Sequence, residues 1–377
     1  MNSAFSRIFN GVDWVLFIAT LPLCAAGLVT IHSFVGTDTF FTRQVLWVLL
    51  AFVLFFVASS IDWRFLRRTN VVVALFVASI VALLLLFLLG TRTLGATSRF
   101  DLGLFFIQPS DPIKLVLILV LAKYFSRRHV EIAHYRHIIV SGFYTLILFL
   151  LLFLQPDFGS AVIVFLVWFG MVLVSGISKK HILLVFVTGA FVFGGLWGFV
   201  FQDYQKDRIR TFLNPLTDLQ GAGYNAFQST IAVGSGQFLG KGVGYGTQSR
   251  LEFLPEYETD FIFAAFSEEW GFVGVVILFM LYGLVVWRIV REAEHGESNF
   301  ETLFALGLAI LFVSHFIVHV GMNIGLLPVT GITMPFMSYG GSHLAMEFVG
   351  LGILMGMRGY RRITQPHKLR GEFVGPQ

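Results

Sequence analysis

The sequence predicts an all-α, polytopic integral membrane protein with about ten transmembrane helices and both termini in the cytoplasm. Three observations support this fold class: the composition, the length of the apolar segments, and the alternation of basic connections between them. Of the 377 residues, 56% are hydrophobic and only 13% are charged. A helix needs about 20 apolar residues to cross a bilayer, and backbone groups in lipid must be bonded internally, so long apolar segments predict helices. The strict alternation of barrel strands is absent.

The apolar segments give the predicted spans in chain order. Their approximate cores are Trp14–Ile31, Val45–Ile61, Val71–Leu89, Ile113–Phe125, Ile138–Leu154, Ala161–Val174, Ile182–Phe201, Phe261–Val290, Leu303–Leu327 and Leu344–Met357. The fourth, sixth and tenth are short for a full crossing. Each of these three is therefore tilted, extended by its polar flanks, or broken.

Lysine and arginine set the predicted orientation, because cytoplasmic loops carry an excess of them. They fill every second connection, namely Arg7; Arg64, Arg67 and Arg68; Arg127, Arg128 and Arg136; Lys179 and Lys180; Arg288 and Arg291; and the group from Arg358 to Arg370. We therefore expect one polytopic membrane domain over residues 1–377. It has a large extracytoplasmic loop at 202–260, between the seventh and eighth helices, and a cytoplasmic tail at 363–377.

Composition also excludes several classes of function. The chain has one cysteine, Cys24, inside the first span, so an intramolecular disulfide or a thiol metal site is ruled out. The net charge of +4 is accounted for by cytoplasmic anchoring residues, so we expect no nucleic-acid partner. The first apolar segment is long enough to span and lacks a clear cleavage site, which argues against a cleavable signal peptide.

The predicted outer connections hold most of the unusual motifs, starting with Gly95–Arg99 and Gln108–Lys114. Proline and serine at 109–112 are typical of a helix start. Lys114 lies about one turn inside the fourth span, where an ionisable group is costly. It either pairs with Asp111, three residues earlier on the same helix face, or grips an anion.

Two aspartates sit at the starts of predicted helices. Asp157, in the turn Gln155–Ser160, either caps the sixth span or belongs to an active site. Asp260 directly precedes the apolar run Phe261–Phe263. A carboxylate at such a boundary suits a general acid or base, whereas capping by Thr259 or Asp260 is the structural alternative.

Two further outer segments are rich in glycine. The run Gly234–Gly246 either lets a ligand approach the backbone closely or is simply a flexible loop. It is not a nucleotide phosphate loop, because no Gly-Lys-Ser/Thr sequence opens a helix there. The run Leu327–Ser342 combines proline, glycine and serine, which predicts irregular backbone that lines a protected cavity.

Ionisable residues inside the later spans have structural and functional interpretations. We expect Glu268 and Glu269 to pair with cations or backbone of neighbouring helices. His315 and His319 lie four apart on one face, but without an obvious third metal ligand they are interpreted as neutral packing residues. Glu347 is expected to be buried against a cation or as a neutral carboxyl.

Taken in order, these motifs resemble those of the SEDS family (shape, elongation, division and sporulation proteins). The resemblance runs from Asp13 to Met357. Its marks are Gly-Ala-x-x-Arg at 95–99, Gln-Pro-Ser-Asp-x-x-Lys at 108–114, Gln-Pro-Asp-Phe-Gly at 155–159, Gly-Tyr-Asn at 223–225, Gln-Ser at 228–229, Thr-Asp-Phe-Ile-Phe at 259–263, Glu-Glu-x-Gly at 268–271, Leu-Pro-Val-Thr-Gly at 327–331 and Ser-Tyr-Gly-Gly-Ser at 338–342. Asp-Trp at 13–14 and Ile-Asp-Trp-Arg at 61–64 are more similar to the elongation branch, RodA, than to the division branch, FtsW.

The resemblance implies a peptidoglycan glycosyltransferase of the bacterial cytoplasmic (inner) membrane that polymerises lipid II by inverting transfer. The family's essential aspartate matches Asp260, the expected general base. Its charged residues in the two Gln-Pro motifs match Asp157, Lys114 and Asp111, the last where glutamate is usual. Glu258 stands where histidine is common, and either adjusts the base or helps to hold a divalent cation.

Further residues are expected to contact substrate, and a protein partner is implied. Arg99, Arg210 and Lys241, with Lys114, would offset pyrophosphate charge, and Ser338 and Ser342 would line the site. No cofactor is required by this resemblance, and a role for Mg²⁺ or Mn²⁺ is left open. The implied partner is a class B penicillin-binding protein whose membrane helix packs on spans eight and nine.

Two rival functions remain at this stage. Intramembrane charges such as Lys114 and Glu347 would suit a lipid II flippase or transporter, but the short inner loops offer no matching cytoplasmic site. A non-catalytic scaffold for cell-wall synthesis partners would leave the outer motifs without a purpose.

Overall fold

The computed structural model describes residues 11–33, 38–93, 96–101, 106–127, 135–176, 203–214, 222–251, 253–254 and 256–364, with isolated residues between 187 and 198. Six of the helices within these ranges are long and apolar enough to cross a membrane. They are Trp14–His32, Thr39–Ser60, Thr69–Leu89, Tyr135–Leu154, Ile262–Glu294 and Asn299–Asn323. The predicted seventh span, 182–201, lies almost wholly outside the described residues.

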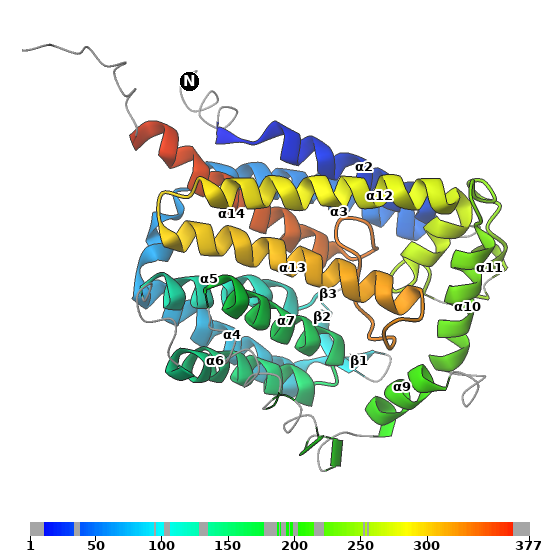
Figure 1. Ribbon diagram of the computed structural model, residues 1–377, viewed down its shortest axis with the longest axis horizontal. Helices are drawn as coiled ribbons and strands as arrows, with labels where there is room; N and C mark the ends of the chain where they lie inside the picture. Colours follow the sequence, from blue (N-terminus) through cyan, green and yellow to red (C-terminus); the bar gives the residue numbers. More distant parts are fainter. Residues whose placement is uncertain are drawn as a thin grey trace, which may run out of the picture.

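The long helices lie side by side in one bundle (Figure 1). They are α2 (Trp14–His32), α3 (Asp38–Ser60), α4 (Thr69–Leu89), α5 (Ser110–Ser126), α6 (Tyr135–Leu154), α7 (Phe158–Val174), α12 (Ile262–Glu294), α13 (Asn299–Asn323) and α14 (Gly341–Thr364). The three spans that were predicted to be short differ in helix length. The helices α5 and α7 have 17 residues each, whereas α14 reaches 24 because its polar flanks are helical.

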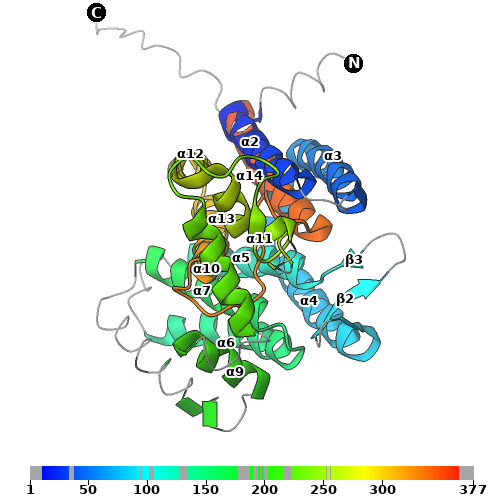
Figure 2. The same ribbon diagram turned by 90° about the vertical axis from the view of Figure 1, so that its right-hand side faces the viewer.

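Shorter elements complete the described chain. A 3-10 helix, η1, covers Trp63–Arg67, and α9 (Asp203–Leu213), α10 (Ala222–Ser235) and α11 (Thr247–Arg250) fall within the predicted long loop. Figure 2 looks along the bundle and shows α10 crossing the end of the bundle. The helix α11 lies at one end of α10, and α9 lies at the other. The strands β1 (Thr91–Thr93), β2 (Ala96–Asp101) and β3 (Phe106–Ile107) form an antiparallel sheet in the order β1-β2-β3. The predicted all-α fold class is confirmed for the bundle, and this small sheet in the connection between α4 and α5 was not predicted.

The core is built from apolar faces that the helices turn toward one another. Phe55, Phe304, Phe312 and Phe348 are among its largest fully buried side chains. Cys24 is also buried, in α2. In contrast, α3, α4 and α12 expose many large apolar residues. Because a bilayer solvates such surfaces, helices with exposed apolar faces are typical of membrane proteins.

An ion-pair cluster joins three helices at the end of the bundle where α2 begins. Asp13 is the N-cap of α2 and accepts from the backbone of Val15 and Leu16, at 3.0 and 3.2 Å. Its buried carboxylate also pairs with Arg288 of α12 and with Arg358 of α14. The sequence analysis assigned both arginines only to cytoplasmic anchoring.

Asp13→Ala is expected to destabilise the protein by up to about 3–5 kcal/mol, because it removes the buried carboxylate that balances the charge of the partly buried Arg288. The matched control is Asp62→Ala, since Asp62 also caps a helix and pairs with arginine, but its side chain is 45% exposed. That change should cost only about 1 kcal/mol. Thermal unfolding of both variants in detergent tests the difference, and equal shifts would contradict it.

The helix α12 is broken at Gly271, which has φ 64° and ψ −166°. The turn formed by residues 236–242 fills the break. The carbonyls of Glu268 and Glu269 accept from the backbone N–H groups of Lys241 and Gly242, at 2.9 and 3.0 Å. Beyond the break, Phe272 and Val273 donate to the carbonyls of residues 237 and 238, at 2.9 and 3.1 Å. The turn thus replaces the hydrogen bonds that a continuous helix would make.

This packing explains the glycine-rich sequence. A Cβ on Gly236 would collide with the Ser267 carbonyl, and one on Gly240 would collide with the Glu269 carbonyl. Gly240 also has a φ of +83°, which glycine adopts without strain. The close approach that glycine permits at these two positions is therefore to the backbone of α12.

Candidate active site

Asp260 lies in a tight turn that leads directly into α12. The backbone N–H groups of Asp260 and Phe261 donate to the carbonyl of Glu256, at 3.0 and 3.2 Å. The helix begins at Ile262, and its N-cap residue, Phe261, has no side-chain cap hydrogen bond. Helix capping by Thr259 or Asp260 is therefore wrong. The Asp260 side chain is half-buried.

Asn323, the last residue of α13, holds this turn from one side. Its amide nitrogen donates to the carbonyl of Asp260 at 3.0 Å, and its amide oxygen accepts from the backbone of Ala264 at 3.2 Å. Ser229 of α10 donates to the Asn323 carbonyl at 2.9 Å. Sequence reasoning missed Asn323, although an asparagine with no exposed surface at the end of an apolar span is an unusual feature.

The loop between α13 and α14 holds the same turn from the other side. The Ser338 hydroxyl donates to the carbonyl of Thr259 at 2.7 Å, and the Tyr339 backbone donates to the carbonyl of Glu258 at 2.8 Å. A Cβ on Gly331 would lie 3.4 Å from Asp260 Oδ2. The loop, orange in Figure 1, is irregular and largely buried, as predicted. Ser338 therefore binds the backbone of the Asp260 turn through its hydroxyl group.

Asp111 and Lys114 form a buried ion pair at the start of α5. Lys114 Nζ lies 3.2 Å from Asp111 Oδ1, and both side chains are about 5% exposed. The pair that their spacing allows is therefore present. The Ser342 hydroxyl donates to Asp111 Oδ2 at 2.7 Å, and His343 Nδ1 lies 3.4 Å from Oδ1. This contact brings the first Gln-Pro motif against the start of α14.

Asp157 caps α7, as one of its two interpretations predicted, by accepting from the backbone of Ser160 at 3.1 Å. Its second oxygen accepts from the side chain of Gln108 at 3.2 Å. The Gln108 backbone in turn donates to the Ser342 hydroxyl at 3.4 Å. The two Gln-Pro motifs and the last loop thus meet, and Gln108 is a second residue that sequence reasoning did not select.

Two predicted anion-binding residues, Lys241 and Arg210, have partners outside this cluster. Lys241 Nζ contacts the buried Glu268 carboxylate at 2.6 Å, so this lysine has a structural partner. Arg210 is exposed on α9 and pairs with Asp207 at 3.1 Å. Arg99 belongs to β2, but its side chain lies outside the described residues. Among the predicted cations whose side chains the structure describes, Lys114 alone contacts the cluster.

Glu258 is half-buried two residues before Asp260, and burial raises the pKa of its carboxyl. Among the described residues, no three histidine, cysteine, aspartate or glutamate side chains are grouped so as to hold a metal ion. The protein side chains seen here therefore do not form a complete divalent-cation site.

The two histidines of α13 are packing residues, as interpreted from the sequence. His315 Nδ1 faces the carbonyl of Thr333 at 3.2 Å, and His319 Nδ1 faces that of Ile332 at 2.6 Å. Both rings are buried and tie α13 to the last loop. His315 also lines a small pocket together with Asp111 and Lys114.

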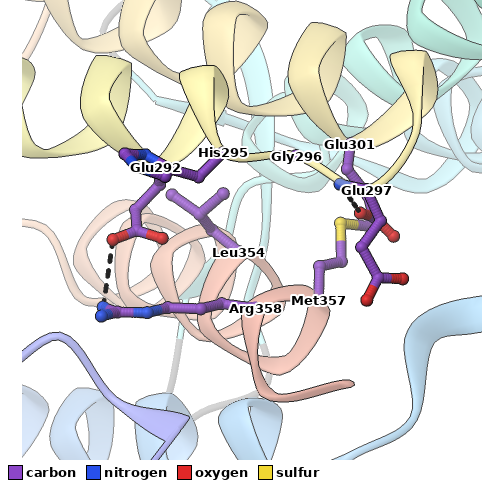
Figure 3. A pocket seen from close by; sticks show the side chains of 8 residues that line it. All are labelled: Glu292, His295, Gly296, Glu297, Glu301, Leu354, Met357 and Arg358. Atoms are coloured by element: carbon purple, nitrogen blue, oxygen red, sulfur yellow. Dashed lines mark hydrogen bonds and ion pairs between the residues drawn. The ribbon is translucent and has the colours of Figure 1, made fainter. Parts of the chain in front are cut away.

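A second small pocket lies between the ends of α12, α13 and α14 (Figure 3). Arg358 extends across it toward Glu292, at 3.1 Å. Glu301 pairs with Arg67 from η1. The carboxylates of Glu292 and Glu301, which line this pocket, are thus paired with arginine. The pocket shares no lining residue with the Asp260 cluster. It is part of the ion-pair cluster that also holds Asp13.

Comparisons with known proteins agree with the motifs. Residues 12–363 match the family named for FtsW, RodA and SpoVE and described as "Cell cycle protein". Peptidoglycan glycosyltransferase MrdB of Escherichia coli K12 is 38% identical over 292 residues, which cover 77% of this chain and 78% of that protein.

Solved structures share the fold. A chain from a peptidoglycan synthase complex, described as coordinating polymerization and crosslinking, superposes with a TM-score of 0.79 at 30% identity and covers 94% and 99% of the two chains. Rod shape determining protein RodA of Thermus thermophilus superposes with a TM-score of 0.68 at 30% identity, covering 92% and 96%. The chain therefore belongs to the FtsW, RodA and SpoVE family, which is the SEDS family that its motifs resemble.

Proposed function

We propose that this protein is a peptidoglycan glycosyltransferase that polymerises lipid II at the outer face of the bacterial cytoplasmic membrane. The observation that carries this proposal is the convergence of the family motifs on the Asp260 turn. Three parts of the chain meet at that end of the bundle. They are loop 328–340, the residues hydrogen-bonded to Gln108, and Asn323. The similarity to MrdB and to RodA supports a role in cell elongation and shape.

Asp260 serves as the general base of the proposed reaction. Its carboxylate takes the proton from the 4-hydroxyl of the acceptor's terminal N-acetylglucosamine as that oxygen attacks the anomeric carbon of the donor. The bond from that carbon to the undecaprenyl pyrophosphate oxygen breaks, and the pyrophosphate leaves with the electron pair. A single displacement inverts the anomeric centre, so one base suffices and no covalent enzyme intermediate is needed.

The leaving pyrophosphate requires positive charge nearby. Lys114 supplies it in this proposal through its buried pair with Asp111, which holds the ammonium in place. Arg99 is proposed to assist, whereas Lys241 and Arg210 have acidic partners and act further from the reaction. A divalent cation would supply Lewis-acid charge at the pyrophosphate, but the residues described do not hold one alone, and the steps above do not depend on it.

The topology follows the positive-inside pattern in this proposal. Ten helices cross the membrane with both termini in the cytoplasm, and residues 202–260 lie outside. The partner is a class B penicillin-binding protein that crosslinks the new glycan and packs against α12 and α13. The similarity to a chain of a peptidoglycan synthase complex supports such a partner.

A polymerisation assay tests this function. Purified protein, with and without the partner, is supplied with labelled lipid II in the presence and absence of EDTA, and the products are separated by gel. We expect a ladder of glycan chains from the complex. Absence of polymer from a folded complex would contradict the proposal and favour the flippase or scaffold. Loss of the ladder only with EDTA would show that a cation completes the site.

A further inference from the structure

His343, in the first turn of α14, lies between two buried carboxylates. Its Nε2 is 2.8 Å from Glu347 Oε1, and its Nδ1 is 3.4 Å from Asp111 Oδ1. Both acidic side chains are 4% exposed. Lys114 pairs with the same Asp111 oxygen, so one cation already faces the Asp111 carboxylate.

The contacts of His343 restrict the protonation states of this cluster. Its Nδ1 has hydrogen-bond geometry to Asp111, whereas its Nε2 lies within ion-pair distance of Glu347 without that geometry. If both groups are carboxylates, a proton on each ring nitrogen places positive charge against both of them. The second oxygen of Glu347 accepts from the Phe336 backbone at 2.8 Å, which favours the carboxylate form. The ring centre of His315 is 4.8 Å from that of His343, its Nδ1 lies 3.2 Å from a carbonyl, and its Nε2 has no hydrogen-bond partner among the described residues, which favours a neutral ring.

Charge balance points the same way. Asp111 and Glu347 carry two negative charges, and Lys114 supplies one positive charge, so a protonated His343 makes the buried group neutral. Buried charges persist only when paired and hydrogen-bonded. The competing arrangement, a neutral His343 facing a protonated Glu347, is also neutral overall, and experiment can distinguish the two.

This cluster is connected to the Asp260 turn through the last loop. Glu347 holds the backbone of Phe336, which has a φ of 61° that a non-glycine residue rarely adopts. Two residues later, Ser338 binds the carbonyl of Thr259. One chain of contacts therefore runs from Lys114 through Asp111, His343 and Glu347 to the loop that holds the proposed base.

We propose that His343 is a positioning residue for the transferase reaction: its imidazolium, held between Asp111 and Glu347, fixes the Asp111–Lys114 pair relative to the Asp260 turn. The proposal rests on the proposed function for its catalytic consequence. The charge state of His343 can be measured without activity.

The test combines kinetics with a direct reading of protonation. Variants His343→Gln and Glu347→Gln each leave one uncompensated buried charge, whereas the double variant restores neutrality. We expect each single change to lower kcat for lipid II by up to about 100-fold, as small misplacements do, with little change in KM. The double variant should recover about tenfold, because coupled residues are not additive.

The matched control is His295→Gln. His295 is exposed at the other end of the bundle and should leave the rate unchanged. If the fold-loss of kcat in the double variant instead equals the product of the fold-losses in the two single variants, the positioning role is wrong.

Solid-state ¹⁵N spectra of histidine-labelled wild type in lipid provide the second reading. The signal that disappears in His343→Gln, or shifts in Glu347→Gln if the former does not fold, identifies His343. Two protonated ring nitrogens near pH 7 support the proposal, and one unprotonated nitrogen overturns it. If wild type makes no polymer, the proposed function fails, but the spectra still decide the charge state of the cluster.

Discussion

Asp260→Asn is expected to lower lipid II polymerisation by about 10²–10⁴-fold, the usual contribution of a general base. Asparagine has nearly the same shape but cannot accept the proton of the acceptor hydroxyl. The hydrogen bonds from Asn323 and to Glu256 use the backbone of Asp260, so they survive the change. The variant should therefore fold, insert and bind its partner normally while its kcat collapses.

The control for this prediction is Asp62→Asn, which makes the same chemical change in the exposed pair with Arg64. It should polymerise at the wild-type rate. Gel assays on both purified variants, with thermal unfolding to confirm folding, give the comparison. A near-normal rate for Asp260→Asn would remove it as the base, and Glu258 and Asp157 would be the next carboxylates to examine.

Gly240→Ala is expected to disrupt the break in α12 and to destabilise the protein strongly, for two reasons that add to each other. The left-handed backbone at Gly240 costs about 1–2 kcal/mol for any other residue. The new Cβ would also collide with the Glu269 carbonyl, and such overpacking costs about 1–3 kcal/mol more. The two hydrogen bonds from Lys241 and Gly242 to α12 would be lost with it.

Gly283→Ala provides a control within α12, the helix that the Gly240 turn contacts. Gly283 is exposed, and a Cβ there has no neighbour within 4 Å. Alanine should stabilise this helical position by about 0.5–1 kcal/mol. Unfolding temperatures measured in detergent should therefore move in opposite directions for the two variants. Equal shifts of the unfolding temperature in the two variants would mean that the turn does not depend on Gly240.

Much of the helical framework could be predicted, because span length and apolar composition act locally. The starts of α4, α6 and α13 lie within a few residues of the predicted segments. The pairing of Lys114 with Asp111 followed from their spacing along one helix. The cap at Asp157 likewise needed only its position in the sequence.

The contacts that assemble the candidate site could not be predicted in this way, because they join residues far apart in the chain. Asn323 reaches Asp260 across 63 positions, and Ser342 reaches Asp111 across 231. Similarly, Lys241 was interpreted as a ligand for an anion because its partner, Glu268, is brought close only by the break in α12. Sequence spacing identifies partners on one helix, whereas partners across the bundle depend on packing.

Cys24 gives the protein a practical advantage for experiments on its topology. Its thiol is the only one in the chain and is buried, so a water-soluble maleimide should find nothing to modify in the native protein. A cysteine introduced at exposed Tyr245 or at exposed His295 would then be the sole reactive position. Labelling in sealed vesicles reports which side each one occupies, without any prior removal of native thiols.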